Sequence, residues 1–108
     1  MYYYDNEEES DVVFVIDGQR VPALRDVLTI KSKVFEDLFS EIKSEEKVTE
    51  ITVNDIEAFK AVIRWCYTEV LVEIADNEIN LMREVVRLAM KYQIYRMVEA
   101  INDRIKFG

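Results

Sequence analysis

The sequence predicts an α+β domain, because a β-hairpin signal near its start is followed by several segments with helical spacing. The apolar run 12–16 ends at Asp17-Gly18, a strong signal for a two-residue hairpin turn, and residues 19–23 are expected to return antiparallel. Pro22 has no amide hydrogen, so we expect it near the end of this second strand or at a sheet edge.

Two short helices are predicted to follow the hairpin. Apolar residues reach helical spacing after Arg25, break at Ser32, and then resume on one face. The apolar positions are Val27, Leu28 and Ile30 before the break, and Val34, Phe35, Leu38 and Phe39 after it. Ser32 is well placed to cap the second helix, because a serine hydroxyl accepts a hydrogen bond from an amide of the first turn.

A loop and a third strand are predicted next. The stretch 40–47 is polar apart from Ile42, which is typical of a loop. Beyond it, Thr49, Ile51 and Val53 occupy every second position, which predicts a strand with one buried face.

Three longer helices complete the predicted order. Asn54 and Glu57 resemble a capping box at the start of the first, and a brief extended run over residues 70–74 separates it from the second. Each helix has an apolar face at helical spacing. These faces comprise Phe59, Val62, Ile63 and Cys66; Met82, Val85, Val86, Ala89 and Tyr92; and Met97, Val98, Ile101 and Ile105.

Length and charge limit the classes of protein and partner. A chain of 108 residues has room for one core, which we assign to residues 10–108 after a flexible acidic lead-in over residues 1–9. The net charge of -8 repels phosphate backbones and anionic lipids, so nucleic acid and membranes are poor candidate partners. The single cysteine cannot form an intrachain disulfide, which favours a reducing intracellular location, cytoplasmic or nuclear.

The sequence lacks the usual chemistry of an active site. It has no histidine, one cysteine and two glycines, which disfavours an acid–base centre, a zinc site and a phosphate-binding loop. We therefore predict no catalytic residue, cofactor or metal. On its helix Cys66 is interpreted as an inert core residue in preference to a reactive thiol, while Trp65 fits either a contact surface or the edge of the core.

Several segments match one known family in order and spacing. A serine before an aromatic pair in residues 30–39 and the Tyr67-Thr68 ending of a central helix are among the matching features. The matching segments are residues 10–23, 30–39, 54–59, 65–68 and 89–94. Together they resemble the BTB/POZ domain over about residues 10–105. Two positions depart from the family pattern, with Leu24 in place of a histidine and Glu69 in place of a glycine.

The resemblance implies a non-catalytic protein–protein interaction module. The leading hypothesis is an adaptor that links a substrate receptor to the cullin three scaffold of a ubiquitin ligase. The alternative is a homodimerisation or oligomerisation module of a transcriptional regulator or scaffold protein. By resemblance the cullin surface would comprise Leu38, Phe39, Ile42 and Tyr95. The spacing of Leu38 and Phe39 also fits the core, which leaves Ile42 the better candidate from the residues themselves.

Overall fold

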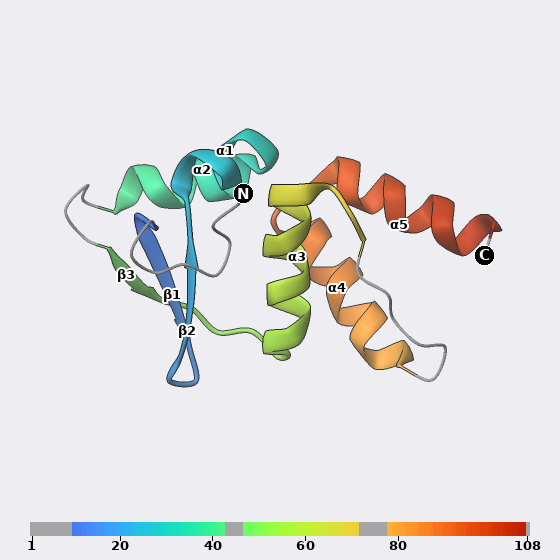
Figure 1. The fold of residues 1–108 in the computed structure, drawn as a ribbon, viewed down its shortest axis with the longest axis horizontal. Coiled ribbons are helices and arrows are strands. Elements are labelled where there is room, and N and C mark those ends of the chain that lie inside the picture. The colour runs from blue at the N-terminus through green and yellow to red at the C-terminus, as the bar shows by residue number, and fades with distance from the viewer. Residues whose placement is uncertain (1–9, 43–46, 72–77, 108) are drawn as a thin grey trace.

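The computed structural model describes residues 10–42, 47–71 and 78–107, and the predicted lead-in over residues 1–9 lies outside them. Figure 1 shows α3 between the sheet with its α1–α2 hairpin on one side and α4 and α5 on the other. The elements in chain order are β1 (Val12–Ile16), β2 (Gln19–Ala23), α1 (Arg25–Lys31), α2 (Lys33–Glu41), β3 (Val48–Glu50), α3 (Ile56–Thr68), α4 (Ile79–Lys91) and α5 (Tyr95–Phe107). The predicted α+β class is confirmed.

The hairpin forms as predicted. Ile16 pairs with Gln19 across a two-residue turn in which Asp17 has a φ of 50° and Gly18 a φ of 79°. Positive φ at both central residues matches the right-handed twist of the flanking strands, which favours this turn in a tight hairpin. Pro22 lies on β2, at one edge of a sheet with the strand order β2-β1-β3.

β3 is shorter than predicted and runs parallel to β1. The predicted alternation is present, since Val53 is buried while Glu50 and Thr52 are exposed. The sheet contact ends earlier than the alternation, with the amide of Ile51 donating to the carbonyl oxygen of Val15 at 3.1 Å. Burial of one face therefore continues after regular strand pairing stops.

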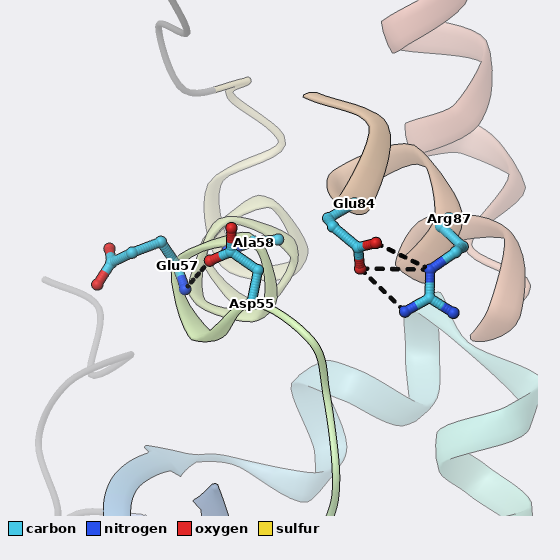
Figure 2. A network of polar contacts seen from close by, with 5 residues as sticks. All are labelled: Asp55, Glu57, Ala58, Glu84 and Arg87. Carbon is cyan, nitrogen blue, oxygen red and sulfur yellow. Dashed lines mark hydrogen bonds and ion pairs between the residues drawn. The ribbon is translucent and has the colours of Figure 1, made fainter. Parts of the chain in front are cut away.

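The start of α3 corrects one sequence prediction. The N-cap is Asp55, one residue after the predicted Asn54, and its carboxylate accepts from the amides of Glu57 at 2.9 Å and Ala58 at 3.4 Å (Figure 2). A carboxylate at this position satisfies two otherwise unpaired donors and carries negative charge at the positive end of the helix dipole. Asn54 instead lies beside Glu84 of α4, where it is among the groups that lower the pKa of that carboxyl.

The core collects the predicted helix faces and corrects two details. Leu28 is buried as predicted, but Ile30 is 78% exposed, because the short α1 presents only one side to the core. Of the two possibilities for Trp65, the structure shows the core, with 3% of the residue exposed. Cys66 is also buried, as predicted.

Part of the predicted 70–74 run lies outside the described residues. Its first two residues, Val70 and Leu71, form no strand. Among the helices that the structure describes, none is both long enough and apolar enough to cross a membrane.

Candidate protein-interaction surface

A cluster of aromatic side chains forms the rigid base of the candidate surface. Phe35 of α2 stacks on Tyr92 at the end of α4, with ring centroids 4.4 Å apart and an interplanar angle of 7°. Phe14 of β1 contacts Phe59 of α3 edge-on at 5.1 Å. The cluster comprises Phe14, Phe35, Phe39, Phe59 and Tyr92. Since its members come from β1, α2, α3 and the end of α4, it fixes these elements against one another.

Ser32 holds α2 against the end of α4. Its hydroxyl accepts from the amide of Phe35 at 3.0 Å, which is the predicted helix cap. The same hydroxyl donates to the carbonyl oxygen of Tyr92, a contact that sequence analysis did not predict. Ser32 is only 1% exposed, so both hydrogen bonds are shielded from water.

The joint between α4 and α5 turns sharply and brings Tyr95 to the surface. Gln93 has a φ of 55°, its amide donates to the carbonyl oxygen of Met90 at 3.1 Å, and the amide of Ile94 donates to that of Ala89 at 2.9 Å. This pair of hydrogen bonds is the Schellman pattern, with Gln93 at the left-handed position and Ile94 buried behind it. Tyr95 follows at once and is 63% exposed.

The four candidate residues from the sequence have different exposures. Phe39 is 7% exposed and belongs to the aromatic cluster, so the structure places it in the core. Leu38 and Ile42 are partly buried and pack against the core from α2 and its C-cap. With Val34 they form a row at four-residue spacing, which lies along one face of the helix. We call Val34, Leu38 and Ile42 the α2 row.

A charged cluster missed by sequence analysis ties α1, α3 and α5 together. Lys31 Nζ lies 2.7 Å from Glu69 Oε1, and Arg96 Nη1 lies 3.7 Å from the same oxygen. The hydrogen bond from Lys31 is the main cause that lowers the pKa of Glu69. Glu69 adopts a φ of 56°, a conformation in which glycine is usual. The glutamate in place of that glycine was the available signal, but nothing in the sequence identified its partners.

Cys66, the single cysteine of the chain, is buried. Burial raises the pKa of the Cys66 thiol to about 12, so at neutral pH it is protonated and a poor nucleophile. No group of three possible metal ligands occurs among the residues that the structure describes.

Comparison with known proteins identifies the fold. The model of the BTB/POZ domain family matches residues 2–107. The chain belongs to the BTB/POZ family. The BTB domain of zebrafish PATZ1 superposes with a TM-score of 0.77 at 21% identity, over 95% of this chain and 80% of that one. BTB domains are protein–protein interaction modules that often dimerise and are generally non-catalytic.

Two curated BTB/POZ proteins are similar in sequence. BTB/POZ and MATH domain-containing protein 4 of Arabidopsis thaliana is 37% identical over 75 residues, which is 68% of this chain and 16% of that protein. BTB/POZ domain-containing protein 9 of Drosophila melanogaster is 28% identical over 102 residues, covering 94% of this chain and 14% of that protein. The chain thus spans less than a fifth of the length of either relative.

Proposed function

We propose that this BTB domain is an adaptor module that binds the cullin three scaffold and connects it to a substrate-receptor domain. The observation that carries the proposal is the α2 row, which stays partly exposed although it packs against the core. Burying apolar surface of this kind against a partner is favourable by roughly 25 cal/mol per Å². A half-buried row on a rigid helix therefore provides a preformed contact for a folded scaffold.

The second part of the proposed surface is the α4–α5 joint. Tyr95 is exposed there, and tyrosine is frequent among residues that dominate binding energy at interfaces. Ser32 and Phe35 fix the start of α2 to the residue that ends α4. Binding along α2 and at the joint then needs little rearrangement, which keeps the entropy cost of association low.

One relative supports the idea of an adaptor that carries a second domain. The name of the Arabidopsis protein records a MATH domain beside its BTB/POZ domain. On this proposal the BTB domain provides the scaffold contact, and substrate recognition belongs to a separate domain. The proposal also requires a cytoplasmic or nuclear location.

Size-exclusion chromatography with light scattering tests the proposal. The domain is run alone and then mixed with the N-terminal region of the cullin, and a co-eluting complex of defined stoichiometry is expected. Tyr95→Ala is expected to weaken this complex by about tenfold or more, as for other buried aromatic contacts. Ile42→Asp is expected to weaken it as well, by placing a charge in the contact.

Ile79→Asp is the matched control for these variants. Ile79 is 58% exposed at the start of α4, at the opposite end of this helix from the α4–α5 joint, so the change adds the same charge without touching the contact. Each variant is first compared with the wild type by its melting temperature. The absence of any co-eluting complex, or equal weakening by Ile79→Asp, would contradict the proposal. A sharp fall in the melting temperature of Ile42→Asp would assign Ile42 to the core. The effect of Tyr95→Ala on the co-eluting complex would then decide whether the proposed surface binds the cullin.

Self-association is the second candidate function. Ile30 of α1 and Tyr95 of α5 are 78% and 63% exposed and border the same pocket. Contiguous exposed apolar side chains, unlike single ones, are typical of contact surfaces. A dimer of standard size buries roughly 1,600 Å² in total. A homodimer in the scattering measurement, unchanged when the cullin is added, would favour this function over the adaptor.

A further inference from the structure

The solvent-facing side of α4 carries a row of basic side chains. Arg83, Arg87 and Lys91 are exposed and follow one another at four-residue spacing, which places them on one face of the helix. The opposite face is buried in the core around Leu88 and Ala89. Because an α-helix rises 1.5 Å per residue, the three positions span about 12 Å along its axis. We call Arg83, Arg87 and Lys91 the basic row.

Most of the charge of the basic row is not neutralised within the described part of the chain. Arg87 is paired with Glu84 on the same helix, with 2.9 Å between Arg87 Nη2 and Glu84 Oε2 (Figure 2). Neither Arg83 nor Lys91 forms an ion pair with another residue that the structure describes. The row therefore presents three cations beside a single carboxylate, in a chain whose net charge is -8.

The stability of α4 does not account for this arrangement. Lys91 lies in the last turn, where the helix dipole favours a cation. Arg83 lies in the first half of the helix, away from that favourable end. Like charges four residues apart also destabilise a helix, and the basic row contains two such steps. The row is therefore better explained by an anionic partner than by the needs of the helix itself.

Met90 adds an apolar contact point beside the basic row. It is 58% exposed and lies three residues after Arg87, on the same side of α4. A methionine side chain is flexible and adapts to irregular surfaces. The guanidinium of Arg87 is oriented by Glu84, which accepts from its Nε at 3.2 Å and from its Nη2 at 2.9 Å. Since arginine has five N–H donors, this pair leaves donors for a second carboxylate.

We propose that the basic row and Met90 bind an acidic helix of a partner protein. Carboxylates at four-residue spacing on that helix repeat at the same interval as the three cations, so that each carboxylate faces one cation when the helices lie side by side. An apolar side chain between the carboxylates contacts Met90. Charge complementarity of this kind speeds the encounter and disfavours partners with a basic surface. The site goes beyond the proposed cullin contact, which consists of the α2 row and Tyr95.

Titration of the ¹⁵N-labelled domain with an acidic helical peptide tests the proposal. The probe is acetyl-Ala-Glu-Ala-Ala-Leu-Glu-Ala-Ala-Leu-Glu-Ala-Ala-amide, and a version with glutamine at each glutamate position is the uncharged comparison. The glutamate peptide is expected to shift the backbone amide cross-peaks of α4 in a saturable way, and less so in high salt. Arg83→Glu is expected to weaken binding by about tenfold, because it removes one attraction and adds a repulsion.

A third peptide of the same composition, with its glutamates next to one another in the chain, tests the spacing. Its carboxylates point in different directions around the helix, so it is expected to bind more weakly than the first peptide. Equal binding of the two would overturn the pairing of a helix with the basic row.

Arg20→Glu is the matched control for Arg83→Glu. Arg20 is exposed on β2, which lies on the other side of α3 from α4 (Figure 1), and it undergoes the same change of charge. It is expected to bind the peptide as the wild type does. Cross-peaks of α4 that do not move, equal binding of the glutamine peptide, or equal weakening by Arg20→Glu would overturn the proposal. Cross-peaks that follow protein concentration and not peptide concentration would assign the face to a second copy of the chain, which also overturns it.

Ile42→Asp separates this proposal from the adaptor function. The variant is expected to lose cullin binding and to keep the peptide-induced shifts of the α4 cross-peaks. Tyr95→Ala gives the same comparison if Ile42→Asp lowers the melting temperature sharply. Peptide binding that disappears together with cullin binding would show that α4 belongs to one shared surface, contrary to the proposal.

Discussion

Lys31, the last residue of α1, and Ser32, which follows it, hold two different helix ends by different kinds of contact. Lys31 reaches Glu69 at the end of α3 through an ion pair near the surface, with side chains 19% and 35% exposed. Ser32 reaches Tyr92 at the end of α4 through a buried hydrogen bond, beside the stacked ring of Phe35. We call these the Lys31 contact and the Ser32 contact.

The difference in burial decides how much each contact contributes to the stability of the fold. Water and salt weaken an exposed ion pair, which typically adds less than about 1 kcal/mol to stability. A buried hydrogen bond cannot be replaced by water, so its loss leaves an unpaired group at a greater cost. The Ser32 contact therefore gives the α2 row and Tyr95 a fixed geometry, whereas the Lys31 contact remains sensitive to water and salt.

The largest expected effect is the loss of the aromatic ring beside Ser32. Phe35 is fully buried and contacts Phe14, Phe39 and Tyr92. Phe35→Ala is expected to lower the free energy of unfolding by about 3–5 kcal/mol, because it removes apolar contacts and leaves a cavity. Urea unfolding measures the change, and a loss below about 1 kcal/mol would show that the region repacks and is not a rigid base.

Ser32→Ala tests the hydrogen bonds directly. The variant removes the cap of α2 and leaves the carbonyl oxygen of Tyr92 without its donor, for an expected loss of about 2–3 kcal/mol. Ser40→Ala is the control, because among the residues that the structure describes its hydroxyl donates to the carbonyl oxygen of Asp37, on the same exposed turn. Equal urea midpoints for the two variants would contradict the special role of the buried hydroxyl.

The features that were predicted correctly from the sequence depend on residues that are close together in the chain. Local patterns identified the Asp17-Gly18 turn and the cap at Ser32, since each depends on residues a few positions apart. The cap of α3 was placed one residue early, because Asn54 and Asp55 are both good capping residues and only the fold brings Asn54 to Glu84. Local spacing is least reliable where tertiary contacts choose between neighbours.

The candidate surface was predicted less completely than the fold. Helical spacing marked Leu38 and Phe39 alike, but only packing against Phe14 and Phe35 assigns Phe39 to the core. The charged cluster depends on α1, α3 and α5 meeting in space, and its two cations, Lys31 and Arg96, are more than sixty positions apart in the chain. Distances of this kind leave no periodic signal in a sequence.

The smallest expected effect concerns the Lys31 contact and depends on pH. The pKa of Glu69 is lowered from its ordinary value of 4.5, first by the hydrogen bond from Lys31 and then by its charge. A carboxyl group whose pKa is lower in the folded state adds stability above its unfolded pKa, and this stability is lost as the pH falls through the folded pKa. Glu69→Gln should therefore lower the melting temperature slightly at pH 7, and the difference from the wild type should shrink below about pH 4.5.

Melting curves at pH 7 and at pH 3, each at low and high salt, measure this effect. Glu99→Gln, an equal change of charge on the exposed side of α5, corrects for the general influence of net charge. The difference between Glu69→Gln and the wild type at pH 7 should also shrink in high salt, since the ion pair lies near water. A difference that persists at pH 3 and in high salt would mean that Glu69 stabilises the fold through its shape and packing, and the contrast with Ser32 would then no longer hold.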